Sequence, residues 1–162
     1  MIQSKTFYLI RHGIATYSTH GYGKRKLTAP ILPEAVPIIS KLATSLKDIK
    51  NSLNISSEII RCRETSALIS TTTGKQFSYD KRLNEEYHET IGEIRTRIQD
   101  FLNDMKKRPE TNIIICTHGA IIAGLKNLLI NGKFVTKHLV DYPPTGTVLI
   151  IKDRTVQIEN FN

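Results

Sequence analysis

Short apolar runs alternate along the chain with longer segments of helical periodicity. The run at 6–10 (TFYLI) is rich in β-branched and aromatic residues, and it predicts a buried strand. Residues 112–117 (NIIICT) give the strongest buried-strand pattern in the chain. We expect further strands within 53–60 (LNISSEII) and at 76–79 (QFSY), and the C-terminal stretch predicts a hairpin closed by Asp153 and Arg154.

Four longer segments predict helices. In 33–49 the apolar residues fall on one face, and Pro33 suits the first turn of a helix. Pro37 lies early in the same pattern and leaves the exact start open by several residues. Further helices are expected over about 61–73, 89–108 and 120–130.

Strands that alternate with helices of this length predict an α/β fold with a mostly parallel sheet. The chain has 162 residues, of which 40% are hydrophobic. This size and composition predict a single domain spanning 1–162 with one buried core.

Charge and composition narrow the function classes. The formal net charge of +8 favours anionic partners, but the basic residues are scattered apart from 24–26 and 106–108. No zinc-finger spacing, basic arm or aromatic RNA-binding motif is present, so we expect no nucleic-acid partner. No apolar stretch approaches the roughly 20 residues that span a bilayer, and the first residues lack a signal-peptide pattern, so the expected location is cytoplasmic. Cys62 and Cys116 are too few for a disulfide framework, and both are expected to be small packing residues.

Two of the predicted strands end in a histidine followed by a glycine. These are YLIRHG, with His12, and IICTHG, with His118. A lone histidine at a strand end is more often structural, but two in the same position favour a shared site. Because ligands of parallel sheets bind at the carboxyl ends of the strands, we expect both histidines to face one ligand.

The motifs around these histidines resemble those of the histidine phosphatase superfamily, the phosphoglycerate-mutase-like proteins. FYLIRHG resembles the family's first motif, SSEIIRCRETSALI (56–69) its second, RLNEE (82–86) its acid motif and ICTHG (115–119) its second histidine motif. The four occur in family order and span nearly the whole chain. The resemblance implies a three-layer α/β/α sandwich with a mostly parallel central sheet.

The resemblance also implies a role for each site residue. His12 would attack phosphorus and form a phosphohistidine, while Arg11 and Arg61 bind the phosphate oxygens. Guanidinium groups suit this task because their planar donors bind phosphate bidentately, and neutral imidazole is a competent nucleophile. His118 would hydrogen-bond the transferring phosphoryl group. The Leu-x-Glu motif favours Glu85 as general acid and base, with Glu86 left as an alternative.

Other positions are weaker candidates. The Gly146 amide is expected to contact phosphate by analogy with the family, and Ser18 stands where many members have an asparagine. Ile14 and Ala15 depart from the usual Glu-Thr after Arg-His-Gly. No metal cluster is apparent, and the implied mechanism needs no cofactor.

These observations predict a metal-independent phosphomonoesterase that acts on small phosphorylated metabolites. A protein phosphohistidine phosphatase is the first alternative, because of the small size and the RHGIA sequence. A phosphoglycerate mutase is disfavoured by the short chain, and a non-catalytic phosphate-binding module is disfavoured by the intact set Arg11, His12, Arg61 and His118. The partner is thus a phosphorylated small molecule or protein, and the oligomeric state stays open.

Overall fold

The computed structural model describes residues 4–16 and 22–162. Within them, six strands form one mixed sheet in the order β3-β2-β4-β1-β5-β6. The strands are β1 (Thr6–Arg11), β2 (Ser52–Ser56), β3 (Ser78–Tyr79), β4 (Asn112–Thr117), β5 (Thr147–Lys152) and β6 (Thr155–Asn160). The first four run parallel, and β5 and β6 form the antiparallel C-terminal hairpin. Asp153 and Arg154, at the turn, both have positive φ (49° and 63°).

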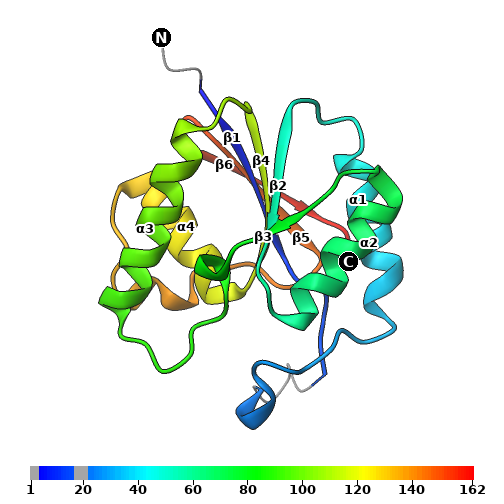
Figure 1. Cartoon of the computed structure of the whole chain (residues 1–162), viewed down its shortest axis with the longest axis horizontal. Coiled ribbons are helices and arrows are strands. Elements are labelled where there is room, and N and C mark those ends of the chain that lie inside the picture. Colours follow the sequence, from blue (N-terminus) through cyan, green and yellow to red (C-terminus); the bar gives the residue numbers. More distant parts are fainter. Residues whose placement is uncertain (1–3, 17–21) are drawn as a thin grey trace.

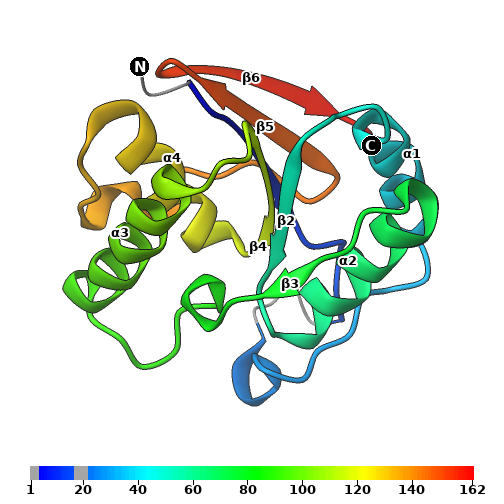
Figure 2. The same ribbon diagram turned by 45° about the horizontal axis from the view of Figure 1, so that its top comes forward.

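Two pairs of helices cover the two faces of the sheet (Figure 1). They are α1 (Ala35–Leu46), α2 (Ile60–Thr73), α3 (Ile91–Lys107) and α4 (Gly119–Asn131). The turned view shows α1 and α2 together on one side and α3 and α4 on the other (Figure 2). The predicted α/β class and three-layer arrangement are confirmed. In the described part of the chain, no helix combines the length and apolar character needed to cross a membrane.

Side chains of the central strands point alternately to the two faces of the sheet, and each face carries its own hydrophobic core. In β1, Phe7 and Leu9 pack with α3 and α4, whereas Ile10 packs with α1 and α2. Strand β4 repeats the pattern, with Ile113 and Ile115 on the first side and Ile114 on the second. Because β1 and β4 carry apolar side chains on both faces, they read as continuous apolar runs in the sequence.

The predicted elements match the structure to within a few residues. The strand at 112–117 has the predicted bounds, and the predicted helix at 61–73 is α2 with one more residue at its start. The helix predicted over 33–49 is shorter, spanning Ala35–Leu46. Pro37 is its third residue, where a backbone N–H has no helical partner, so proline is compatible with this position.

Gly13 allows the end of β1 to lie directly against α1. A Cβ atom at this position would sit 2.6 Å from Ile39 Cδ1 and 2.9 Å from Ala35 Cβ. Real Cβ atoms do not approach other carbons so closely, so the close packing of β1 on α1 requires glycine.

We therefore expect Gly13→Ala to lower the free energy of unfolding by about 1–3 kcal/mol through overpacking. Ile39→Val removes the nearest carbon and should restore part of the loss. Gly92→Ala is the matched control, because its Cβ would meet only atoms 3.8 and 3.9 Å away. In helix α3 this control should be neutral or stabilising by up to about 1 kcal/mol. Urea unfolding measures all three variants, and a Gly13→Ala protein as stable as the wild type contradicts the packing argument.

Candidate active site

Parallel pairing of β1 and β4 brings His12 and His118 together. The register pairs Arg11 with Thr117, and the His12 amide donates to the Thr117 carbonyl at 3.1 Å. The two imidazoles follow at the same edge of the sheet, with ring centroids 5.2 Å apart. Both are buried, with His12 1% and His118 0% exposed.

The hydrogen bonds of His12 leave its Nε2 unprotonated. Nδ1 lies 2.8 Å from the Gly13 carbonyl oxygen, which can only accept, so Nδ1 carries the proton. Nε2 accepts from Arg61 Nε at 3.2 Å. Burial lowers the pKa of His12 to about 3, and the positive charge of Arg61 adds to the effect. His12 is therefore a neutral imidazole with a lone pair on Nε2, as a nucleophile requires.

Arg61 is a fully buried cation held by several segments. Besides His12, its Nη1 donates to the Lys26 carbonyl at 2.5 Å and its Nη2 to Glu85 Oε2 at 3.2 Å. The guanidinium carbon lies 4.1 Å from the centre of the Tyr22 ring. Thr65 links the backbone after β1 to the first turn of α2. Its Oγ1 accepts from the Gly13 amide and donates to the Arg61 carbonyl.

Arg11 presents a second guanidinium at the end of β1. Its Nη1 reaches the Pro143 carbonyl at 3.4 Å, and the group lies over the Tyr142 ring at 5.0 Å. Its buried Nε has no hydrogen-bond partner among the described residues. A buried donor without a partner is costly, and the Arg11 side chain also lines the cavity described below.

His118 stands at the start of α4, as its N-cap residue. Its Nε2 lies 2.8 Å from Ser57 Oγ, and its Nδ1 lies 3.6 Å from Glu85 Oε2. Within residues 4–16 and 22–162, this buried Nδ1 has no hydrogen-bond partner. Burial holds the pKa of His118 well below its usual value, and the neighbouring His12 and Arg61 lower it further.

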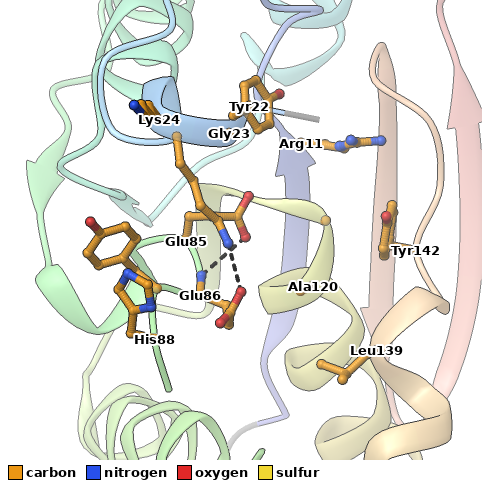
Figure 3. A pocket seen from close by; sticks show the side chains of 13 residues that line it. Arg11, Tyr22, Gly23, Lys24, Glu85, Glu86, His88, Ala120, Leu139 and Tyr142 are labelled. Atoms are coloured by element: carbon orange, nitrogen blue, oxygen red, sulfur yellow. Dashed lines mark hydrogen bonds and ion pairs between the residues drawn. The ribbon is translucent and has the colours of Figure 1, made fainter. Parts of the chain in front are cut away.

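The two candidate carboxylates point to different partners. Glu85 is 13% exposed and lies between Arg61 and His118. Glu86 is 33% exposed and forms an ion pair with Lys26 at 2.7 Å. Both line the cavity (Figure 3). Of the two, Glu85 contacts Arg61 and His118, which favours it over Glu86 as the candidate acid.

A cavity of about 720 Å³ adjoins these groups through Arg11 and Glu85, which line it, whereas His12, Arg61 and His118 are not among its lining residues. Arg11 and Tyr142 face it from one side, with Glu85, Glu86 and His88 across from them (Figure 3). His88 has a φ of 52°, an uncommon conformation for a residue other than glycine. The remaining lining comes from side chains and backbone of Tyr22, Gly23, Lys24, Lys26, Tyr87, Gly119, Ala120 and Leu139.

The structure thus brings five predicted residues together, namely Arg11, His12, Arg61, Glu85 and His118. Ser18 lies outside the described residues. Gly146 does not line this cavity; it borders a smaller one beside Gly13 and Asn162, and its phosphate contact stays a prediction. Among residues 4–16 and 22–162, no group of three or more histidine, cysteine, aspartate or glutamate side chains could hold a metal ion.

Sequence reasoning missed several neighbours of these groups. Tyr22 and Tyr142 each cover a guanidinium, and Ser57 and Cys62 contact His118 Nε2. Ser57 and Cys62 lie inside the second motif, close to Arg61 in the sequence, so they could have been predicted as neighbours of the site. Tyr142 lies far from every motif and had no such signal.

Comparison with known proteins agrees with the geometry of the site. A family model described as "Histidine phosphatase superfamily (branch 1)" matches residues 7–89, which hold the first three of the four motifs. No curated protein matches the chain in sequence.

Many solved structures share the fold at low sequence identity. The alpha-ribazole phosphatase from Shigella flexneri has a TM-score of 0.77 at 17% identity, covering 96% of this chain and 95% of that one. The mycobacterial glucosyl-3-phosphoglycerate phosphatase has a TM-score of 0.77 at 15% identity, covering 93% and 91%. The phosphoglycerate mutase from Bacillus anthracis has a TM-score of 0.74 at 18% identity, covering 98% and 92%. At these identities the likeness concerns the fold.

The buried, neutral state of His12 predicts a pH-dependent stability. Its pKa is about 3 in the folded protein against 6.5 for the exposed side chain, so the unfolded chain binds the extra proton first. The stabilisation is complete above about pH 6.5 and is lost as pH falls towards 3. Between about pH 7.5 and about pH 5, His12 should account for about 2 kcal/mol of lost stability.

Urea unfolding of the wild type and of His12→Asn at both pH values measures this contribution. The variant, which lacks the titrating group, should lose about 2 kcal/mol less than the wild type. Equal losses in the two proteins would mean that His12 is not held neutral by the fold.

Proposed function

The chain belongs to the histidine phosphatase superfamily, and we propose that it is a metal-independent phosphomonoesterase that acts on small phosphorylated metabolites through a phosphohistidine at His12. The observation that carries the proposal is the unprotonated Nε2 of His12, buried beside Arg61, which in turn contacts Glu85 in the lining of a cavity that Arg11 also lines. A phosphate dianion placed there would meet two guanidinium groups and an in-line nucleophile.

In the first half-reaction, His12 Nε2 attacks phosphorus as the bond to the ester oxygen breaks. The incoming phosphate takes over the Arg61 Nε donor that otherwise bonds to His12 Nε2. Glu85 in its acid form gives its proton to the leaving oxygen, so the alcohol departs neutral. His118, at the other side of the cluster, hydrogen-bonds the phosphoryl oxygens as their charge redistributes.

In the second half-reaction, the Glu85 carboxylate accepts a proton from water as that water attacks phosphorus. The bond between Nε2 and phosphorus breaks, inorganic phosphate leaves, and both His12 and the acid return to their starting protonation states. One carboxyl group thus serves both steps, which fits the position of Glu85 beside both Arg61 and His118.

Small metabolites are the proposed substrates for two reasons. His12 is only 1% exposed, so a phosphoryl group must enter the cavity to reach it. The cavity of about 720 Å³ has room for an alcohol the size of a sugar or nucleoside, and two structural neighbours carry the names of phosphatases of small phosphate esters.

A hydrolysis screen over small phosphate esters tests the proposal, with His12→Ala as the blank. We expect turnover of at least one ester and an acid-labile phosphorylated protein in quenched reactions, both absent from His12→Ala. Phosphorylated histidine-containing proteins and phosphoglycerates enter the same screen as competing substrates. Turnover retained in His12→Ala contradicts the assigned nucleophile, and hydrolysis of phosphohistidine proteins alone contradicts the assigned substrate class.

Leaving-group dependence distinguishes Glu85 from Glu86. Glu85→Gln should slow hydrolysis of glycerol phosphate by about 10²–10⁴-fold, because its alkoxide needs a proton. The same variant should slow p-nitrophenyl phosphate by less than about tenfold, since p-nitrophenolate leaves as a stable anion. Glu86→Gln is the matched control and should resemble the wild type on both esters. The reverse pattern between the two variants would assign the acid to Glu86.

A further inference from the structure

Ser57 forms three hydrogen-bond contacts at the back of the site. The residue follows β2 and is fully buried. Its Oγ lies 2.8 Å from His118 Nε2, 3.0 Å from Asn84 Oδ1 and 3.1 Å from the Ile59 amide nitrogen. A hydroxyl has one proton to give, so the three contacts cannot all be donated by Ser57.

The direction of each contact follows from Asn84. The Glu58 amide donates to Asn84 Oδ1 at 2.9 Å, and a backbone N–H can only donate, so this side-chain atom is the amide oxygen. An amide oxygen only accepts, so Ser57 donates its proton to Asn84. The Ser57 oxygen then accepts from the Ile59 amide and from His118 Nε2, which must carry a proton.

We propose that Ser57 and Asn84 are positioning residues that hold His118 in the Nε2–H tautomer, so that its bare Nδ1 faces Glu85 and the phosphate site. Cys62 Sγ, 3.4 Å from the same Nε2, is a second and weaker acceptor for that proton. His12 has the opposite tautomer, with the proton on Nδ1. The two buried imidazoles therefore each direct an unprotonated nitrogen into the cluster.

This arrangement has a consequence for phosphoryl transfer, which rests on the proposed function. Nδ1 and Glu85 Oε2 are 3.6 Å apart, and both are acceptors when the carboxyl is ionised. His118 can donate to a phosphoryl oxygen from Nδ1 only after this nitrogen takes up a proton. Because Glu85 must also be protonated to serve the leaving oxygen, the complex with a phosphate dianion holds two additional protons on the pair Glu85 and His118, one on the carboxyl group and one on Nδ1.

The charges around His118 explain why the proton arrives only with the anion. His12 on β1 and Glu85 face it directly, and Cys62 comes from α2. Cationic groups also act on it from three elements, with Arg11 at the end of β1, Arg61 on α2 and Arg97 on α3. Burial lowers the pKa of His118, and these cations lower it further. A bound dianion offsets them.

Long-range proton–nitrogen NMR spectra test the tautomer without reference to turnover. In the wild type we expect the Nε2–H pattern for His118 and the Nδ1–H pattern for His12, with the signals assigned from His118→Gln and His12→Asn. Asn84→Ala frees the Ser57 hydroxyl to donate to Nε2, so the Nδ1–H form of His118 should appear. Asn84→Asp keeps the accepting oxygen and should keep the Nε2–H form. The control Ser56→Ala removes a neighbouring buried hydroxyl that donates to the Ser57 carbonyl.

An Nδ1–H pattern for His118 in the wild type overturns the proposal, as does an unchanged pattern in Asn84→Ala. Because the wild-type spectrum needs no variant in the hydrogen-bond chain, a misfolded Asn84→Ala protein does not block the test. An absence of phosphatase turnover would contradict the proposed function and leave the tautomer result to stand by itself.

Kinetics test the consequence for catalysis on an ester that the wild type hydrolyses. Asn84→Ala should lower kcat by about tenfold with KM within about twofold, the size of effect expected for one lost hydrogen bond. The basic limb of its kcat–pH profile should move to higher pH, because the Nδ1–H tautomer donates to the phosphoryl oxygen without taking up a proton. Asn84→Asp and Ser56→Ala should keep the wild-type limb. An unchanged kcat and limb in Asn84→Ala, with the tautomer altered, would refute the role in transfer.

Discussion

The buried guanidinium of Arg61 is the group around which the site is organised. A fully buried cation is stable only when its donors are satisfied and an opposite charge is near. Those partners come from separate segments, namely the imidazole of His12, the carbonyl of Lys26 and the carboxylate of Glu85. Satisfying one charge therefore brings His12 and Glu85, the proposed nucleophile and acid, to the same point, and the charge also helps to keep His12 neutral.

The same contacts prepare the site for a dianion. Arg61 donates to His12 and Glu85, and in the proposed reaction a phosphoryl group takes over these donors. Among the described residues, two further buried nitrogen atoms of the site have no hydrogen-bond partner. They are Nε of Arg11 and Nδ1 of His118. Polar atoms left unpaired in a protein interior are costly, so a bound anion that pairs with them would offset this cost. When phosphate binds, Arg61 thus exchanges hydrogen bonds to protein groups for hydrogen bonds to phosphate oxygens, and the buried positive charge that receives the anion is already present.

The sequence was sufficient for the elements and for the residues that meet at the strand ends. The run at 112–117 is apolar on both faces, so its bounds and burial could be predicted, and its register with β1 places His118 beside His12. The contact of Tyr142 with Arg11 could not be predicted from the sequence, because it depends on how the chain returns to the sheet after α4. The hydrogen-bond chain from Asn84 through Ser57 to His118 joins three segments, and only their three-dimensional packing reveals its direction.

The account depends on His12 Nε2 being the atom that attacks phosphorus. A crystal structure of the protein with orthovanadate, a mimic of the pentacoordinate phosphoryl group, examines this atom directly. We expect vanadium bonded to His12 Nε2, with Arg61 turned from the imidazole to the equatorial oxygens and His118 Nδ1 within hydrogen-bond distance of one of them. Vanadate bound elsewhere, with the contact between Arg61 and His12 intact, would contradict the account.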